Sequence, residues 1–213
     1  SPMLSKMRKA KTQRRMIKFP NKKYNIIYAD PPWQYNDKMT MQGVYGLIRG
    51  AESFYKTMNL TDIKNMPIQN IADDNCYLFL WVTMPLLQEG LDVINSWGFK
   101  YKTCGFTWVK KTKNNKTHCG MGHYTRGNAE LCLIGVKGKL LRLDASVRQI
   151  VEAQIQRHSQ KPNEIRDNIL QLYGDLPRIE LFARQTAEGW DSWGNEVQKD
   201  NEAKTNKKQQ ELF

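Results

Sequence analysis

A short apolar run that stops at two consecutive prolines places the strongest constraint on the fold of this chain. Residues 24–29, Tyr-Asn-Ile-Ile-Tyr-Ala, are rich in β-branched and aromatic types, which favours a buried strand. Pro31 and Pro32 cannot donate to a sheet ladder, so the chain must leave the sheet there. We therefore predict that Asp30 stands at the carboxyl end of a central strand, where ligands bind in open α/β sheets.

Further apolar runs alternate with helical patterns along the chain. Strands are expected at residues 77–82, 101–109, 129–136, within 147–156, and at 178–183. Helices are expected at 85–97 and 163–173, because their apolar residues recur with a helical period and a glycine follows each run. A short helix should begin near Leu60 with Thr61 as its cap. This alternation predicts an α/β fold, a mostly parallel sheet with helices on both faces. Trp81 and Trp108 fall in expected strands, which favours the core over a substrate platform.

The positive charge is concentrated at the N-terminus. The 213-residue chain has a net charge of +12, and residues 1–23 carry nine Lys or Arg and no acid. Residues 24–196 carry +2, and the tail, residues 197–213, is polar and rich in Asn, Gln and Lys, as disordered segments are. We expect a basic arm, one folded domain and a disordered tail with these bounds. The arm favours nucleic acid as a partner, with a purely solubilising arm as the alternative.

A second basic segment, residues 110–128, is rich in Lys and Gly and has no hydrophobic period. This composition predicts a mobile loop. Lys110, Lys111 and Arg126 are candidates for contacts with nucleic-acid phosphates, which give affinity without sequence choice.

The cysteines give no sign of a metal site or of a disulfide framework. They are Cys76, Cys104, Cys119 and Cys132, and none forms a Cys-x-x-Cys pair. Residues 118–123 bring two His and one Cys together without a clear fourth ligand, so we expect no metal. Reduced thiols suit a cytoplasmic protein. No apolar run is long enough to span a membrane.

The tetrapeptide Asp-Pro-Pro-Trp at a strand end suits the methylation of an exocyclic amine on a base. The lone pair of such an amine is delocalised into the ring, which makes it a poor nucleophile. Two acceptors for its N–H groups leave the nitrogen closer to sp³, and Asp30 and the Pro31 carbonyl can supply them. Trp33 can stack on a base flipped out of its helix. For an Asp-Pro dipeptide alone, a strand followed by a rigid loop is the plain alternative.

Seven segments resemble, in order, the N6-adenine methyltransferase family that includes the catalytic subunit of the messenger-RNA N6-adenosine methyltransferase. They are IIYADPPW (26–33), YLFLWVT (77–83), GFTWVKK (105–111), ELCLIGVKG (130–138), HSQKPNEI (158–165), RIELFAR (178–184) and GWDSWGNE (189–196). The short prokaryotic and phage-type members are the most similar. The resemblance implies a Rossmann-like sheet, S-adenosylmethionine as donor and transfer to N6 of adenine. It favours DNA as the substrate, with RNA as the alternative.

The resemblance also implies roles for individual residues. The catalytic motif is matched by Asp30, Pro31, Pro32 and Trp33. The donor site is matched by Asp30, Lys161, Phe182, Arg184, Asn195 and Glu196. Within it, Lys161 corresponds to the lysine that pairs with the donor's carboxylate, and Glu196 replaces a glutamine of the messenger-RNA enzymes. Tyr45, in the loop after the motif, is a candidate to line the base pocket.

Two rival functions come from other classes. One is a catalytically silent subunit that supports an active partner, and the intact Asp-Pro-Pro-Trp motif argues against it. The other is a basic-tailed nucleic-acid-binding protein that binds no donor. The sequence leaves open the recognition site, the strand preference, a homodimer or partner subunit, and any cognate restriction enzyme.

Overall fold

The computed structural model describes residues 18–34, 57–120, 122, 124–156, 160–194 and 197. Within them, seven strands form one sheet in the order β5–β3–β4–β2–β1–β6–β7. The strands are β1 (Tyr24–Ala29), β2 (Ala72–Val82), β3 (Lys100–Lys111), β4 (Ala129–Lys137), β5 (Ile150–Gln154), β6 (Arg178–Leu181) and β7 (Asp191–Trp193). β4 alone runs against the others, because it is antiparallel to both β2 and β3 while the remaining pairs are parallel. The predicted α/β class with a mostly parallel sheet is confirmed.

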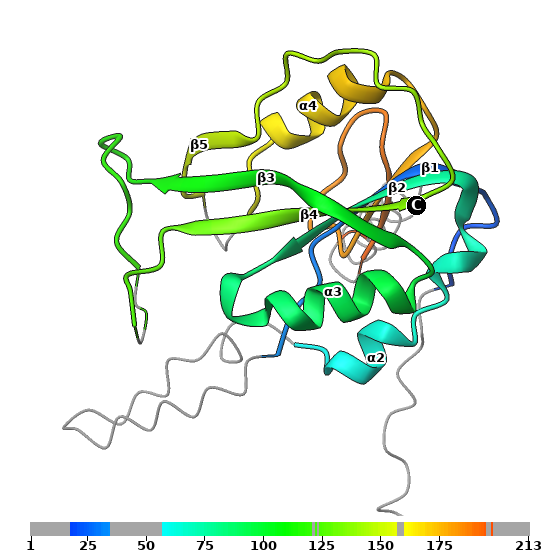
Figure 1. Cartoon of the computed structure of the whole chain (residues 1–213), viewed down its shortest axis with the longest axis horizontal. Coiled ribbons are helices and arrows are strands. Elements are labelled where there is room, and N and C mark those ends of the chain that lie inside the picture. Colours follow the sequence, from blue (N-terminus) through cyan, green and yellow to red (C-terminus); the bar gives the residue numbers. More distant parts are fainter. Residues whose placement is uncertain are drawn as a thin grey trace, which may run out of the picture.

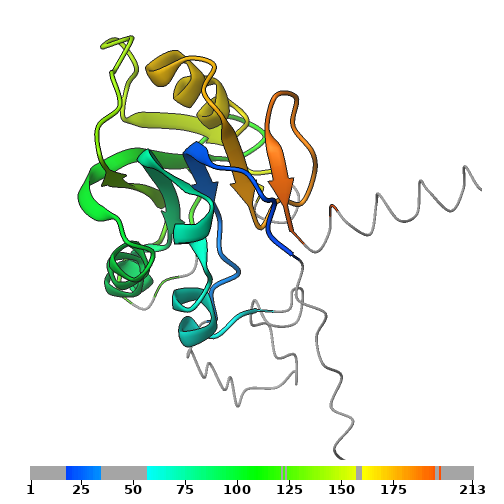
Figure 2. The same ribbon diagram turned by 90° about the vertical axis from the view of Figure 1, so that its right-hand side faces the viewer.

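Helices cover both faces of this sheet, as Figure 1 shows. α2 (Leu60–Lys64) and α3 (Leu87–Ser96) lie on one face and α4 (Glu164–Tyr173) on the other, with the sheet between the two layers (Figure 2). Successive side chains of a strand point to opposite faces. Ile27 therefore packs in the cluster with α2 and α3, while Ile26 and Tyr28 pack in the cluster with α4. Burial on both faces explains the continuous apolar sequence of β1.

Several boundaries differ from those expected. β2 begins at Ala72, five residues before its apolar run. The sequence did not indicate this early start because the first half of the strand carries Asp73, Asp74 and Asn75. The helix expected from residue 85 starts with a 3₁₀ turn, η4 (Met84–Leu86), and a second 3₁₀ turn, η3 (Ile68–Asn70), follows α2. The half-buried β7 was not expected.

Backbone hydrogen bonds join described residues of the segment between β3 and β4, residues 112–128, to one another and to the two strands. We call this segment the β3–β4 connection. The Lys110 N–H donates to the Asn128 carbonyl at 2.8 Å, and the His118 N–H donates to the Lys110 carbonyl at 2.8 Å. Farther out, the Gly120 N–H donates to the Gly127 carbonyl at 2.9 Å. Backbone hydrogen bonds therefore fix the base of the connection to the two strands.

The sequence suggested Thr61 as the cap of α2, but the cap is Asn59. The Asp62 N–H donates to Asn59 Oδ1 at 2.8 Å, and the Asn59 amide donates to Asp62 Oδ2 at 2.9 Å. Thr61 lies one residue inside the helix with its side chain exposed.

Asn59→Ala should therefore lower the free energy of unfolding by about 1 kcal/mol, because it removes the acceptor for a helix N–H. The matched variant Thr61→Ala should change it by less than about 0.5 kcal/mol, because alanine is a good helix former. Urea denaturation of both variants measures the difference. Equal losses would mean that Asn59 does not cap the helix.

Two further findings concern membrane-spanning helices and the state of the cysteines. Within the described residues, no helix is long and apolar enough to cross a bilayer. All four cysteines are free thiols, and those of Cys76 and Cys132 are buried.

Candidate active site

The direction of the strands gathers the candidate residues at one edge of the sheet. All strands except β4 end there, so Asp30 follows β1 and Phe182 follows β6 at the same edge. Lys161 comes after β5 and before α4. Because β4 runs the other way, it begins at this edge, and Glu130 pairs with Trp108 near the end of β3. Residues far apart in the sequence are thereby brought together.

Four side chains of alternating sign form a continuous chain of ion pairs. Lys161 Nζ lies 2.8 Å from Asp30 Oδ2 and 3.1 Å from Glu130 Oε2. Lys110 Nζ contacts the other oxygen, Glu130 Oε1, at 2.5 Å. We call Lys110, Glu130, Lys161 and Asp30 the charge chain. Its two cations and two anions balance, which is the condition for holding several charges in a poorly hydrated place.

Burial and charge act in opposite directions on the inner members of the charge chain. The side chains of Lys161 and Glu130 are only 10% and 9% exposed. Burial by itself lowers the pKa of Lys161, but the carboxylates of Asp30 and Glu130 outweigh it and raise that pKa above its usual value. Burial likewise raises the pKa of Glu130, but the ammonium groups of Lys161 and Lys110 outweigh it and lower that pKa. Both groups are therefore charged at neutral pH.

Two buried tryptophans lie beside the cations of the charge chain. Lys161 Nζ is 5.4 Å from the centre of the Trp81 ring, and Lys110 Nζ is 5.2 Å from that of Trp108. Both indoles are fully buried, and Trp81 Nε1 donates to the Tyr28 hydroxyl at 2.8 Å. The expected place of these tryptophans in the core is confirmed. From there their rings support the ammonium groups by cation–π contact.

The Asp-Pro-Pro-Trp loop is fastened to the sheet by its own tryptophan. Trp33 is only 7% exposed, and its indole Nε1 donates to the Trp81 carbonyl on β2 at 3.0 Å. Its backbone N–H donates to the Pro31 carbonyl at 2.8 Å, and the Met58 N–H donates to the Pro32 carbonyl at 2.8 Å. A carbonyl oxygen has two lone pairs, so Pro31 can accept a second hydrogen bond. Stacking of Trp33 on a base stays a prediction. Its hydrogen bond to Trp81 shows that its side chain attaches the loop to β2.

The end of β6 is tightly built around Phe182. This residue has φ +61°, a left-handed conformation that costs a bulky side chain free energy. Its ring meets that of Trp193 edge-on at 5.6 Å between centres. A Cβ on Gly194 would lie 2.4 Å from the Ala183 carbonyl oxygen, so only glycine allows the two segments to approach this closely. Such local strain is typical of functional sites.

The lysines expected to contact phosphates are engaged in ion pairs. Lys110 is held by Glu130, and Lys111 Nζ lies 3.0 Å from a Glu152 carboxylate oxygen. Their side chains are only 21% and 16% exposed. Arg126, on the β3–β4 connection, is exposed as expected.

Other expected residues lie outside the described part of the chain. They are Tyr45, Asn195, Glu196 and most of the basic arm, residues 1–17. Among the described residues, no three His, Cys, Asp or Glu side chains are grouped to hold a metal ion, and His123 of the 118–123 segment is outside them.

Sequence reasoning missed two buried acids. Glu130 stood out only as part of a motif, and Glu180 only as part of a strand. Arg166 on α4 binds Glu180 through two hydrogen bonds, of 2.7 and 3.0 Å. An acid inside or beside an apolar run is the signal that can find such residues, because a buried carboxylate needs a cationic partner.

Comparison with known proteins identifies the family that matches this chain. Residues 24–196 match the MT-A70 family. The chain is similar to the Type II methyltransferase M.MunI of Mycoplasma sp, with 37% identity over 191 residues, 84% of this chain and 79% of the relative. It is 28% identical over 180 residues to the human N(6)-adenosine-methyltransferase catalytic subunit METTL3, of which the match covers 28%. The Drosophila melanogaster MT-A70-like protein is 27% identical over 180 residues. The matched span contains the whole charge chain.

Proposed function

This chain belongs to the MT-A70 family, and on that premise we propose that it transfers a methyl group from S-adenosylmethionine to N6 of adenine in DNA. The resemblance predicted from the seven segments is confirmed, and with it the class of enzyme, an adenine-N6 methyltransferase. DNA is supported by the greater identity to a Type II methyltransferase, a class of DNA-modifying enzymes, than to the N(6)-adenosine-methyltransferases.

The single observation that carries the proposal is the contact between Asp30 and Lys161 at the carboxyl edge of the sheet. Lys161 Nζ lies 2.8 Å from Asp30 Oδ2, and an aspartate carboxylate can only accept hydrogen bonds. We propose that Asp30 and the Pro31 carbonyl accept hydrogen bonds from the two N–H groups of the adenine amine. This orients the nitrogen lone pair toward the methyl group. The N–C bond forms as the S–C bond breaks, and the amine proton then leaves to solvent or transiently to Asp30.

The residues at this edge fit S-adenosylmethionine by their chemistry. The donor is an amino acid joined through a sulfonium to adenosine, and it supplies an electrophilic methyl group when bound. Lys161 is a compact cation with three N–H donors, which suits a carboxylate. Phe182 and Arg184 follow β6 at the same edge and suit the adenosine part. We assign the same part to Asn195 and Glu196, and the base pocket to Trp33 and Tyr45.

The reaction is tested with methyl-labelled S-adenosylmethionine and, separately, duplex DNA, single-stranded DNA and RNA. The products are digested to nucleosides and identified by mass. We expect N6-methyl-2′-deoxyadenosine from a DNA pool. N6-methyladenosine from the RNA pool would move the substrate to RNA. No product with intact donor binding would identify a silent subunit that needs a partner, and no donor binding would leave a nucleic-acid-binding protein.

We propose that exposed cations near the active edge contact the phosphates. Lys113, Lys116 and Arg126 are exposed on the β3–β4 connection, whereas Lys110 and Lys111 are held in ion pairs. The basic arm adds further cations. Nucleic acid is thus the proposed partner, and its phosphates are contacted without sequence choice.

Removal of the arm should weaken DNA binding and flatten its salt dependence. The deletion should cover residues 3–17, with six Lys or Arg, and stop there, because Phe19 stacks on Trp193 at 4.5 Å between ring centres. For each phosphate that the shortened protein no longer neutralises, the slope of log affinity against log salt should fall by about 0.9. Deletion of residues 199–213, which carry nearly balanced charge, is the control. An unchanged slope after arm deletion would make the arm a solubilising tail.

We further propose that the protein acts in the cytoplasm of a prokaryotic or phage-infected cell. The bacterial source of the relative M.MunI and the four free thiols support this location. Whether it acts alone, as a homodimer or with a partner subunit is decided by the activity of the purified chain and its mass in solution.

A further inference from the structure

Two members of the charge chain have no part in the reaction as proposed so far. Asp30 accepts from the amine and Lys161 serves the donor, but Glu130 and Lys110 are buried beside them. We propose that Glu130 and Lys110 are positioning residues that hold Lys161 in place beside Asp30. This inference rests on the proposed methyl transfer, because it concerns the geometry of the same edge.

Glu130 fixes Lys161 independently of Asp30. Each of its two carboxylate oxygens takes one cation, Oε1 that of Lys110 and Oε2 that of Lys161. With Glu130 in place, Lys161 stays charged and located while Asp30 turns to receive the adenine amine. Without Glu130, Lys161 would lose one of its two carboxylate partners, pair more tightly with Asp30 and draw that carboxylate away from the substrate.

Lys110 fixes Glu130 in turn. Its ammonium is placed by the Trp108 ring on one side and by Glu130 on the other. Lys110 also keeps the charge chain neutral. Without it, the carboxylates of Glu130 and Asp30 would share the single ammonium of Lys161. A Glu130 carboxylate that can rotate would let Lys161 move, and small displacements at a reacting centre have large effects on rate.

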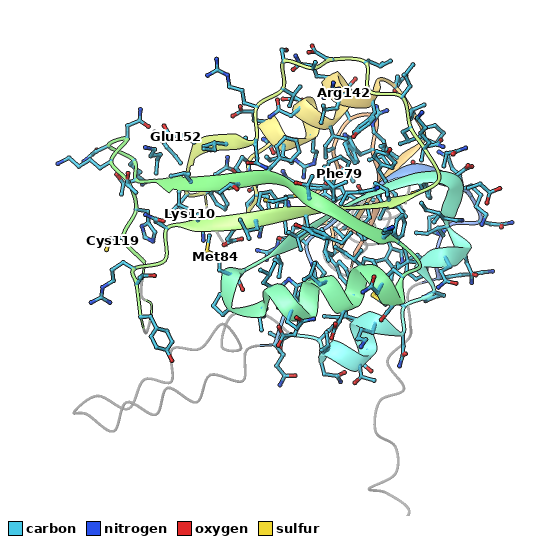
Figure 3. The ribbon with its side chains drawn as sticks, viewed as in Figure 1. Phe79, Met84, Lys110, Cys119, Arg142 and Glu152 are labelled. Atoms are coloured by element: carbon cyan, nitrogen blue, oxygen red, sulfur yellow. The ribbon has the colours of Figure 1, made fainter. Side chains whose placement is uncertain are left out.

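The positions of the two residues connect the charge chain to the DNA-facing surface proposed above. Lys110 lies at the end of β3 and Glu130 near the start of β4, so they frame the base of the β3–β4 connection. Figure 3 shows Lys110 at this base, with Cys119 farther out along the connection and Glu152 on β5. The phosphate-contacting segment is therefore anchored next to the catalytic acid.

The pH dependence follows from the groups that surround Lys161. Asp30 after β1 and Glu130 and Cys132 on β4 act on Lys161 directly. The next charged and titratable groups act on these three or on each other: Lys110 on β3 acts on Glu130, Tyr28 on β1 on Cys132, Glu180 on β6 on Asp30, and Arg166 on α4 pairs with Glu180. Burial raises the pKa of both Tyr28 and Cys132, so these two stay neutral in the working range. Removing the Glu130 charge takes away one of the anions that raise the pKa of Lys161. The alkaline limb of the rate should then move to lower pH.

Glu130→Gln tests the proposal in the full-length enzyme. We expect kcat to fall about a hundredfold and KM for S-adenosylmethionine to rise about tenfold, because Lys161, which Glu130 holds, is also assigned to the donor's carboxylate. The alkaline limb of kcat should move to lower pH. In the free enzyme, the ¹³Cε resonance of Lys161, assigned by its loss in Lys161→Arg, should titrate at lower pH than in the wild type. That titration reports on Lys161 without any turnover.

Two further variants separate positioning from folding. Lys110→Met should lower kcat about tenfold, and Lys110→Arg should restore most of it, because arginine keeps the cation. Glu152→Gln is the matched control. Glu152 pairs with Lys111 at 3.0 Å on neighbouring strands, but it is 59% exposed and outside the charge chain. This variant should keep the wild-type rate and pH profile.

The inference is overturned if Glu130→Gln and Lys110→Met keep kcat within about twofold of wild type and leave the Lys161 titration unchanged. A wild-type protein inactive on every nucleic acid would instead refute the proposed function. The Lys161 titration would still decide the positioning of Lys161 in that case.

Discussion

Asp30→Asn is expected to slow methyl transfer by about a thousandfold or more while donor affinity stays within about threefold. The amide has nearly the shape of the carboxylate, but it loses the negative charge and one of the two acceptor oxygens. It also presents N–H groups where the adenine amine must donate. The ion pair with Lys161 at 2.8 Å is lost as well, though Glu130 still holds the lysine.

Single-turnover rates and calorimetric titration of S-adenosylmethionine separate these two effects. Asp74→Asn is the matched control, because Asp74 also pairs with a lysine, Lys137 at 3.6 Å, but is fully exposed. The control should keep the wild-type rate. An Asp30→Asn enzyme that still methylates near the wild-type rate would remove Asp30 from the centre of the mechanism.

Arg166→Met is expected to lower the free energy of unfolding by about 3–5 kcal/mol. Arg166 binds Glu180 through two hydrogen bonds and Asn163 Oδ1 at 2.9 Å, and its guanidinium lies 5.8 Å from the centre of the Tyr28 ring. Arg166 and Glu180 are only 8% and 9% exposed. The substitution therefore leaves a buried carboxylate without its cation.

The pH dependence and a double variant identify the cause of this loss. Burial raises the pKa of Glu180, and losing Arg166 raises it further. The folded protein then binds a proton more readily than the unfolded chain, so the loss should be largest at neutral pH and shrink as the pH falls. Arg166→Met with Glu180→Leu should recover most of the stability, because no unpaired charge remains. The exposed Arg142 provides the control, Arg142→Met, with a change within about 0.5 kcal/mol.

These unfolding free energies come from urea denaturation at neutral and at mildly acidic pH. A double variant as unstable as Arg166→Met alone would mean that packing, and not the unpaired charge, causes the loss.

The fold was predictable where apolar runs are strong and their ends are marked. β1 has the predicted bounds because two prolines follow closely and both faces are buried. α4 ends at Tyr173 where Gly174 adopts φ +77°, as the glycine suggested. The first half of β2 was not predictable, because its Asp and Asn side chains are exposed and local propensity favours a turn there. β7 is three half-buried residues held by tertiary contacts: it pairs with β6, Tyr24 donates to Asp191, and Phe19 stacks on Trp193.

The candidate site was predictable residue by residue but not as an arrangement. Asp30 and Lys161 were singled out from motifs, yet 131 positions separate them and nothing in their spacing indicates the ion pair. Glu130 carried no role because its two cationic partners come from other segments. Lys110 and Lys111 were assigned to the surface by composition, whereas tertiary ion pairs hold them partly buried. Long-range electrostatic pairs depend on topology, which local sequence does not contain.

The reversed direction of β4 has a consequence for how the affinity of such an enzyme for nucleic acid can be changed. The β3–β4 connection leaves and re-enters the sheet at the edge that holds Asp30, and none of its described residues belongs to the hydrophobic core. Insertions, deletions or exchanges within residues 112–128 are therefore expected to leave the chemistry and the core intact as long as Lys110 and Glu130 remain. Phosphate binding and bond-making are separable in this architecture, and the connection is the segment to exchange or randomise when a methyltransferase of altered affinity for nucleic acid is wanted.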